Sequence, residues 1–478
     1  MAIIIEQKPL YKTLPVGQDI IFTVKDDTIV ANNFNVKFVA KVYVDESSSN
    51  LYNTTPIAVL KTTPNNAGVG IFSLQPVLEN FVKPDNKGTD FGNTSTYKTV
   101  SYSDATPHPI HLIDKFATSN NAAKYFMVEF FLEYSTSQTG VVSIDTTNFK
   151  ISDFFLFYNG YLQYNDVLNQ IGADYGYQLD DFNYVMNDTD AKFLSNAPTT
   201  QYARLTDYGT LPFFNFLSTV DYSFQTGTDD ATDFRVYNFN IKLYNSSNTL
   251  LATITHFANW TNGAFTNANN LARTRINYLG AFPANLDGWS TSWDAHKANT
   301  SYYTIQAFDD DNNAISQLYT INIITDDCKG FEGIRLTWLN PHGTWDYYTF
   351  TKKSVRSLST NRTSYTQLDG TWNESTYMID GFKGGKKNFR VNTKEMIRIN
   401  TDYLVDADAI WFEDLINSPE VYILNGYSSS DTSGMVNKYV EPVTVTTSSY
   451  TRKTKANDKL IQYTFELEKT KNKRIQSA

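Results

Sequence analysis

The stretch FEGIRLTWLNPHGTWDYYTF, residues 331–350, gathers two tryptophans, two tyrosines and two phenylalanines around one Asn-Pro-His-Gly turn. Leu336 and Trp338 share one side of an extended strand before the turn, and Trp345 and Tyr347 share one side after it. Two strands with aromatic side chains packed across the pair account for this cluster without a ligand. The alternative is an aromatic surface for a flat ligand, with Trp345 and Tyr347 stacking on a sugar.

The same alternation of apolar and polar residues predicts strands elsewhere in the chain. In KLIQYTFELE (459–468) the apolar residues Ile461, Tyr463, Phe465 and Leu467 alternate with polar ones, which is typical of a strand with one buried face. VYNFNIKLYN (236–245) reads the same way and is followed by Ser-Ser-Asn and TLLATITHF (249–257), which together predict a hairpin. YFMVEFFLEY (125–134) is apolar on nearly both faces and predicts a central strand of a sandwich.

One helix is predicted, over residues 402–417 of the stretch NTDYLVDADAIWFEDLINSP. Thr401 can cap the first turn, Asp402 complements the positive end of the helix dipole, and Pro419 prevents continuation. Leu404, Ala407, Trp411 and Leu415 form an apolar stripe that we expect to pack on a sheet.

Length and composition predict a folded, mainly β protein made of several β-sandwich-like domains in tandem, with the one helix packed on the last of them. The 478 residues are 41% hydrophobic and 19% charged, enough to bury sizeable cores, and Tyr, Phe, Thr, Asn and Ser favour strands and turns. The predicted divisions are a sandwich at 1–165, a turn-rich connection at 166–210, a second sandwich-like domain at 211–330, and a β domain with the helix and a basic tail at 331–478.

Charge and cysteine content argue against several classes of protein. A net charge of −10 does not suit a chain that neutralises nucleic-acid phosphates. The single cysteine excludes an intrachain disulfide, as is typical of proteins made in a reducing cytoplasm. The opening MAIIIEQKPLYKTLP lacks the features of a signal peptide, and no apolar run reaches about 18 residues, so we expect no membrane insertion.

The search for reactive groups yields no predicted catalytic, cofactor or metal site. His108 and His111 have ligand-like spacing, but the prolines around them favour an extended loop. The stretch 309–320 begins like a calcium loop yet lacks the glycine and the closing glutamate, so a hairpin turn is the prediction and a calcium site the alternative. Three Asp-Asp pairs are interpreted as solvated loops, and Cys328 as a small buried side chain.

Several phrases occur in an order that resembles virion tail and baseplate structural proteins, of the distal-tail or tail-ring kind, in bacteriophages that infect Bacteroidetes. In the C-terminal half these phrases are DDCKGFEGIRLTWLNPHGTWDYYTF, LVDADAIWFEDLINSPEVYI, EPVTVTTSSYTRK and DKLIQYTFELE. IIIEQKPLYKTLPVGQDIIFTV and FYNGYLQY resemble the N-terminal parts of such proteins. The phrases carry no catalytic motif, and they leave open whether the phage has a long or a short tail.

The resemblance implies a non-enzymatic structural protein, made in the host cytoplasm and incorporated in the virion tail, baseplate or neck. Its partners would be copies of itself in a homo-oligomeric ring and other virion proteins, with no cofactor. Two ends suit contact with a neighbour: Ile3, Ile4 and Ile5, as a strand added to a sheet edge, and the basic tail with Lys469, Lys471, Lys473 and Arg474. The alternative for both ends is a frayed terminus.

A different class of function, a carbohydrate-binding adhesin of the virion that recognises a host-surface glycan, is the alternative prediction. The Asn- and Asp-rich loops and the aromatic rings of residues 331–350 motivate it. A glycan-degrading enzyme is the third reading, but no two carboxylates can be placed across a cleft from the sequence.

Overall fold

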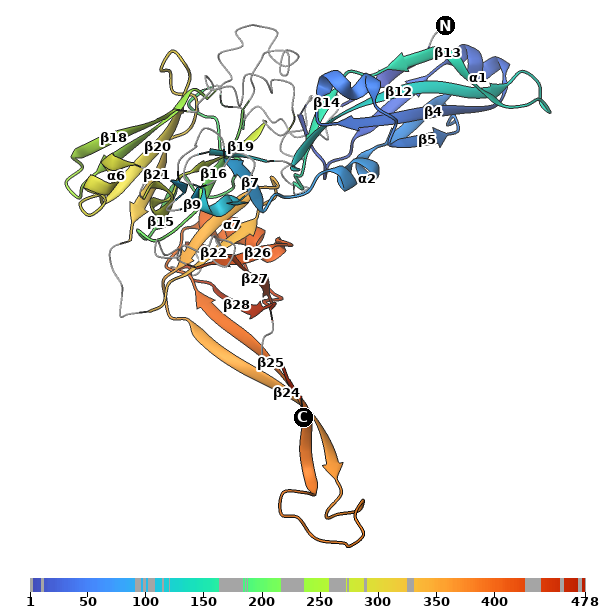
Figure 1. The fold of residues 1–478 in the computed structure, drawn as a ribbon. Coiled ribbons are helices and arrows are strands. Elements are labelled where there is room, and N and C mark those ends of the chain that lie inside the picture. The colour runs from blue at the N-terminus through green and yellow to red at the C-terminus, as the bar shows by residue number, and fades with distance from the viewer. Residues whose placement is uncertain are drawn as a thin grey trace. The chain divides into compact units, whose positions relative to one another are not determined.

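The fold is known from a computed structural model that describes residues 3–9, 13–90, 96–97, 100–101, 108–113, 116–119, 121–162, 184, 186, 188–215, 236–257, 272, 275–287, 290–324, 331–425, 440–455, 460–471 and 475–477. The described chain is mainly β and forms six sheets, as the composition predicts (Figure 1). No described helix is both long and apolar enough to cross a membrane.

The chain divides into two compact units that do not follow one another simply along the sequence. The first unit comprises Met1–Ile324, Leu339–Asp346 and Gly426–Asn437, and the second comprises Thr325–Trp338, Tyr347–Asn425 and Lys438–Ala478. The four predicted divisions, at 1–165, 166–210, 211–330 and 331–478, remain predictions.

The N-terminal part of the first unit is a β-sandwich. Its larger sheet has the order β2(Thr13–Pro15), β14(Phe155–Tyr158), β12(Ala123–Ser135), β4(Phe34–Asp45) and β5(Ala58–Thr62), with β13(Ser143–Ile151) also on β12. Its smaller sheet is β1(Ile4–Gln7), β3(Ile21–Lys25) and β6(Val69–Ser73). Phe22 of the smaller sheet lies 5.7 Å from Phe130 of the larger one, ring centre to ring centre. The two sheets therefore share one core, and β12 lies mid-sheet as its two apolar faces predict.

Short helical turns connect the strands of this sandwich: α1(Asp27–Asn32), η1(Ser48–Asn53), α2(Gln75–Leu78) and η2(Glu79–Phe81). The Asp26 carboxylate caps α1 by accepting hydrogen bonds from the backbone N–H groups of Thr28 and Ile29. An aspartate in this position satisfies N–H groups that have no partner inside the helix.

Two five-stranded sheets form the rest of the first unit. One has the order β10(His108–Pro109), β7(Lys87–Asp90), β11(Phe116–Thr118), β19(Ile276–Gly280), β16(Thr210–Phe214), and the other β15(Thr200–Ala203), β21(Tyr319–Ile323), β20(Tyr302–Phe308), β17(Asn238–Tyr244), β18(Leu250–Phe257). Phe239 of β17 lies 5.1 Å from Phe213 and 5.9 Å from Phe116, which joins the two sheets through one apolar layer. The pairing of β17 with β18 confirms the predicted hairpin.

Smaller elements complete this part: β8(Thr96–Tyr97), β9(Val100–Ser101), η3(Ile110–Leu112), α5(Pro283–Leu286) and α6(Thr291–His296). The acidic stretch after β20 is a turn, as predicted, because Phe308 bridges Ala314 across it. The buried Asp309 carboxylate accepts hydrogen bonds from the backbone N–H and the side-chain amide of Asn313.

The second unit is built on an eight-stranded sheet. Its order is β23(Trp345–Phe350), β22(Ile334–Leu339), β26(Val421–Leu424), β27(Val440–Val445), β28(Thr464–Lys469), β25(Gly385–Asn400) and β24(Val355–Gln367), with β29(Ile475–Ser477) also on β25. Alternation in 459–468 predicts the face correctly, since Ile461, Tyr463, Phe465 and Leu467 are all buried.

The helix α7(Asp406–Asn417) packs on this sheet, and it begins four residues later than position 402, where the sequence pattern places its start. Thr401 does not cap it, because the Thr401 hydroxyl instead accepts a hydrogen bond from the backbone N–H of Tyr463. Asp408 takes the capping role by accepting from the N–H of Val405. Trp411 lies 5.0 Å from Trp338, and Trp411 and Leu415 of the predicted stripe are buried. Ala407 is exposed, and Leu404 precedes the helix, so the stripe is only partly as predicted.

Candidate functional site

The aromatic stretch at 331–350 lies in the protein core. Trp345 is fully buried, its indole N–H donates to the backbone carbonyl of Asp85 at 2.9 Å, and the ring of His111 meets it edge-on at 5.0 Å. Tyr347 is only 3% exposed, with the Arg335 guanidinium 5.4 Å from the centre of its ring. Neither ring has a face open to a sugar, so this placement does not support the stacking site that the sequence suggests.

The turn between the two strands is held by one buried asparagine. The side-chain oxygen of Asn340 accepts from the backbone N–H groups of His342 and Thr344, and its amide donates to the Leu194 carbonyl at 2.9 Å. Gly343 adopts a φ of +72°, in the left-handed region that favours glycine. The stretch is thus two core strands joined by a tightly bonded turn.

Of the residues predicted as assembly contacts, Ile3, Ile5 and Lys469 contact other parts of the chain. Ile3 belongs to the sandwich core, and β1, with Ile4 half-exposed and Ile5 partly buried, pairs with β3. Lys469 forms ion pairs with two glutamates, as described below, while Lys471 is exposed. Lys473 and Arg474 lie outside the described residues.

Of the candidate metal ligands His108 and His111, the structure describes the side chain of His111. His111 is fully buried against Trp345, and burial lowers its pKa to about 3. Over the described ranges no group of three His, Cys, Asp or Glu side chains could hold a metal ion. Cys328 and the three Asp-Asp pairs lie outside those ranges, so their predicted roles stay predictions.

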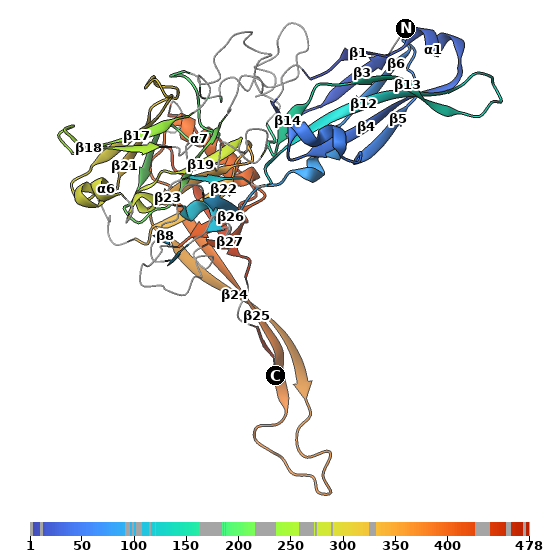
Figure 2. The ribbon, with the colours of Figure 1, turned by 45° about the horizontal axis from the view of Figure 1, so that its top comes forward.

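A long hairpin that the sequence pattern does not predict, here called the arm, is formed by β24, β25 and the loop between them (Val355–Asn400). Figures 1 and 2 show its outer part extending beyond the other strands of its sheet. β28 pairs with β25 only from Met396 to Asn400, and β29 only from Arg390 to Asn392. Every residue of β24 except Gln367 is exposed, so the outer arm is a two-stranded ribbon with both faces in water.

The loop at the end of the arm, residues 368–384, here called the arm tip, exposes an unusual density of large apolar side chains. Six of them are more than half exposed: Leu368, Trp372, Tyr377, Met378, Ile379 and Phe382. Isolated exposed apolar residues are ordinary, but a contiguous group of them marks an interaction surface. Neither face of the outer ribbon offers a core that could receive these side chains.

The arm tip is nevertheless locally ordered. The Thr371 hydroxyl donates to the Thr376 carbonyl at 2.7 Å and accepts from the Met378 N–H at 2.8 Å. Trp372 and Tyr377 meet edge to face at 5.6 Å, and together with Thr371 and Glu374 they line an open hollow. The tip therefore holds its apolar side chains in a defined arrangement outside any core.

Charge separates the arm from the rest of the chain. Between residues 355 and 400 there are eight Lys and Arg against four Asp and Glu, whereas the remaining residues contain 32 Lys and Arg against 46 Asp and Glu. The arm is thus a net positive element of a chain whose remaining residues are strongly acidic. Its outer strand ends place Lys386, Lys387 and Arg390 next to the tip.

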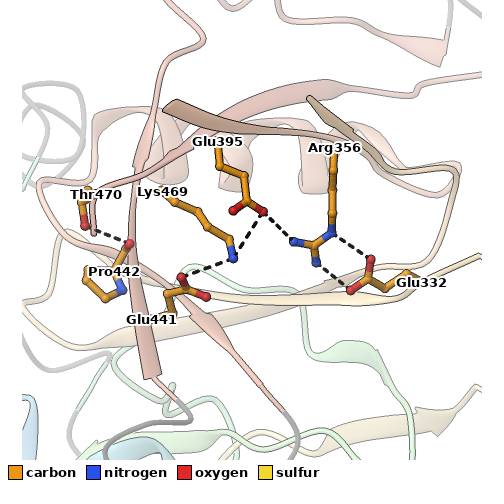
Figure 3. Close-up of polar contacts among 7 residues, drawn as sticks. All are labelled: Glu332, Arg356, Glu395, Glu441, Pro442, Lys469 and Thr470. Atoms are coloured by element: carbon orange, nitrogen blue, oxygen red, sulfur yellow. Dashed lines mark hydrogen bonds and ion pairs between the residues drawn. The ribbon is translucent and has the colours of Figure 1, made fainter. Parts of the chain in front are cut away.

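An ion-pair network fixes the root of the arm (Figure 3). Arg356 of β24 contacts Glu332 at 2.7 Å and Glu395 of β25 at 3.3 Å. Lys469 of β28 contacts the same Glu395 at 3.5 Å and Glu441 of β27 at 3.3 Å. Hydrogen bonding to Glu332 raises the pKa of the Arg356 guanidinium further above its ordinary value. The network links four strands where the arm leaves the sheet.

The sequence contains a signal for the arm, although it is weak. Residues 355–367 are rich in Ser and Thr, residues 386–400 carry five Lys and Arg, and the Gly-containing stretch DGFKGGKK (380–387) lies at the start of the second segment. Such segments lack an alternating apolar face, which is what the sequence analysis searched for, because a ribbon with two wet faces has no reason to alternate.

No protein-family model matches the chain, and a comparison with curated proteins found no match.

Proposed function

We propose that this protein is a non-enzymatic structural component of a bacteriophage particle, which assembles with copies of itself into a ring of the tail, baseplate or neck. The order of sequence segments that resembles phage tail and baseplate proteins supports both the kind of particle and the place of the protein in it. The protein would be made in the host cytoplasm and incorporated in the virion together with other structural proteins.

The observation that carries the assembly part of this proposal is the exposed apolar arm tip. Six large apolar side chains lie in water at the end of a ribbon that has no core of its own. Permanent protein interfaces are rich in such aromatic and aliphatic side chains, and each contact of a ring buries on the order of 2,000 Å² or more. A chain that works in an assembly has a place for these side chains, whereas an isolated chain leaves them hydrated.

The test is the mass of the purified protein in solution, by light scattering, with negative-stain images of the same fraction. We expect a particle several times the chain mass of 54.3 kDa, with a ring outline whose symmetry gives the number of copies. A mass of one chain at every concentration tested contradicts the proposal.

The second candidate is a carbohydrate-binding adhesin, and one observation favours it. The exposed rings of Trp372 and Tyr377, beside the Glu374 carboxylate, line the open hollow of the arm tip, and aromatic faces next to polar groups suit sugar stacking. This candidate predicts saturable binding to host-surface polysaccharide that Trp372→Ala abolishes. Tyr403→Ala, at a tyrosine that is 62% exposed outside the arm, is the matched control and should bind normally. Absence of saturable binding by the unaltered protein removes the candidate.

A further inference from the structure

We propose that the arm of one chain docks on the acidic surface of a second copy, with the arm tip as the apolar anchor and the basic ribbon beside it as the electrostatic guide. This inference rests on the proposed self-assembly and names the surface that performs it. It differs from the sequence-based expectation, which assigns the contact to the two chain ends.

The first step is that, among the described residues, the arm has one strand edge, that of β24, with no neighbouring strand. β24 is the edge strand of its sheet, 13 residues long, and over the described residues only β25 pairs with it. Long exposed edges are normally covered, shortened or blocked, because their free N–H and C=O groups pair readily with another chain. β24 carries only Arg356 and Arg362 as charged residues along this edge, which is little protection.

The second step is that the tip has the composition of an interface centre. Trp372, Tyr377, Met378 and Phe382 belong to the residue types that are enriched where interfaces are fully buried. The hydrogen bonds of Thr371 hold the loop, so its side chains are already positioned before contact. Such preorganisation lowers the entropy lost on binding.

The third step identifies the partner by charge. The arm is net positive, and the rest of the chain has 14 more acidic than basic residues, so a second copy offers the complementary surface. A nucleic acid would also attract the basic ribbon, but it offers no apolar receptor for Ile379 and Leu368, which are 79% and 69% exposed. A second copy offers acidic charge, and it also exposes large apolar side chains outside the arm, among them Val141 and Leu460.

The fourth step is that the root of the arm is attached to its sheet by ion pairs as well as by strand pairing. The network of Arg356, Glu395 and Lys469 joins the root of the arm to its own sheet, so force on the tip passes into the eight-stranded sheet. If the root of each arm is held by its own sheet and the apolar tip binds the next copy, successive copies contact one another head to tail. Such a head-to-tail contact closes into a ring when the rotation between copies allows it.

Two variants of the full chain test this inference by light scattering. In the first, Trp372→Ser, Ile379→Ser and Phe382→Ser are combined, which removes the apolar anchor at exposed positions. In the second, residues 364–389 are replaced by Asn-Gly, a two-residue turn that suits the paired ends Thr363 and Arg390. We expect both variants to fall to the mass of one chain, 54.3 kDa, while circular dichroism stays that of a folded β protein.

The matched control combines Tyr52→Ser, Leu318→Ser and Tyr403→Ser, three large side chains that are each at least 51% exposed outside the arm. This control should keep the mass of the unaltered protein. If the unaltered protein assembles and both arm variants assemble equally well, the arm inference is overturned while the proposed function stands. If the unaltered protein is a single chain throughout, the proposed function fails and the docking with it.

Zero-length carbodiimide cross-linking of a mixture of normal and heavy-isotope chains identifies the contact directly. We expect mixed-isotope links from Lys386 or Lys387 to carboxylates outside Val355–Asn400, and fewer of them as salt concentration rises. Links confined to single chains overturn the inference. Binding of the arm to host polysaccharide, with loss in the Trp372 variant and no mixed-isotope links, assigns the tip to the adhesin candidate instead.

Discussion

Acid should destabilise the first unit through two buried histidines. His111 lies in η3 against the indole of Trp345, and burial lowers its pKa to about 3. His342 lies in the turn at 340–344, 4.6 Å from the ring of Tyr184, and burial together with the charge of Lys192 lowers its pKa to about 4. Both imidazoles are neutral in the folded protein at neutral pH.

The sign follows from where the protons bind. In the unfolded chain a histidine takes up a proton below about pH 6.5, whereas these two stay neutral in the folded chain until the pH nears their lowered pKa values. The unfolded state then binds more protons, so stability is fully present above about pH 6.5 and is lost as the pH falls. Well below pH 6.5 each group contributes about 1.4 kcal/mol per pH unit, so the pair costs about 3 kcal/mol between pH 6.5 and 5. That loss is a large part of the stability of an ordinary domain.

Urea unfolding at a series of pH values, followed by tryptophan fluorescence, measures this dependence. His111→Gln should lower the slope of unfolding free energy against pH by up to about 1.4 kcal/mol per pH unit, because the proton linkage of His111 is removed. Leu112→Ala, at the adjacent fully buried residue, is the control that lowers stability without changing the slope. Equal slopes in the unaltered protein and His111→Gln would refute the reasoning.

Three further predictions concern stability. Gly343→Ala should lower the free energy of unfolding, measured in urea, by about 2–4 kcal/mol, because φ is +72° and a Cβ would lie 1.6 Å from the Asn159 carbonyl oxygen. Gly381→Ala is the control: a Cβ there would have no atom within 4 Å, so the free energy of unfolding should not change. Trp338→Ala should lower the unfolding free energy of the second unit by about 3–5 kcal/mol, since the ring is fully buried under α7; a loss below about 1 kcal/mol in urea unfolding would contradict this. Arg356→Ala should cost less than about 1 kcal/mol, as expected for exposed ion pairs, but should speed amide hydrogen exchange at the arm root, and unchanged exchange there would count against the role of the network.

The core strands could be predicted from the sequence because burial leaves a periodic pattern. The alternation in 461–468 and 236–245 corresponds to β28 and β17, with Phe465 and Leu467 of β28 and Phe239, Ile241 and Leu243 of β17 buried as predicted. The helix start was wrong by four residues, because Thr401 satisfies Tyr463 on a neighbouring strand rather than the first helical turn. Local capping rules do not contain such long-range partners.

The arm could not be predicted in this way, and neither could the burial of Trp345. The exposed strand β24 has no apolar period, so alternation does not indicate residues 355–367 as a strand. For Trp345, the partners are Asp85 and His111, more than 200 residues earlier in the chain, and no local pattern indicates which ring will find such a pocket. An aromatic cluster in a sequence thus predicts strand pairing more reliably than it predicts whether the rings are exposed to solvent.

The assignment of Leu339–Asp346 to the first unit has a consequence for biosynthesis. The ribosome completes Met1–Ile324 before it reaches this segment, so the nascent first unit lacks Trp345 and the Asn340 turn until the start of the second unit has also been made. The final packing of the first unit is therefore a late event in translation. A fragment that ends at residue 324 would keep its strands but carry an unfilled tryptophan pocket, which makes it a poor substitute for the full chain.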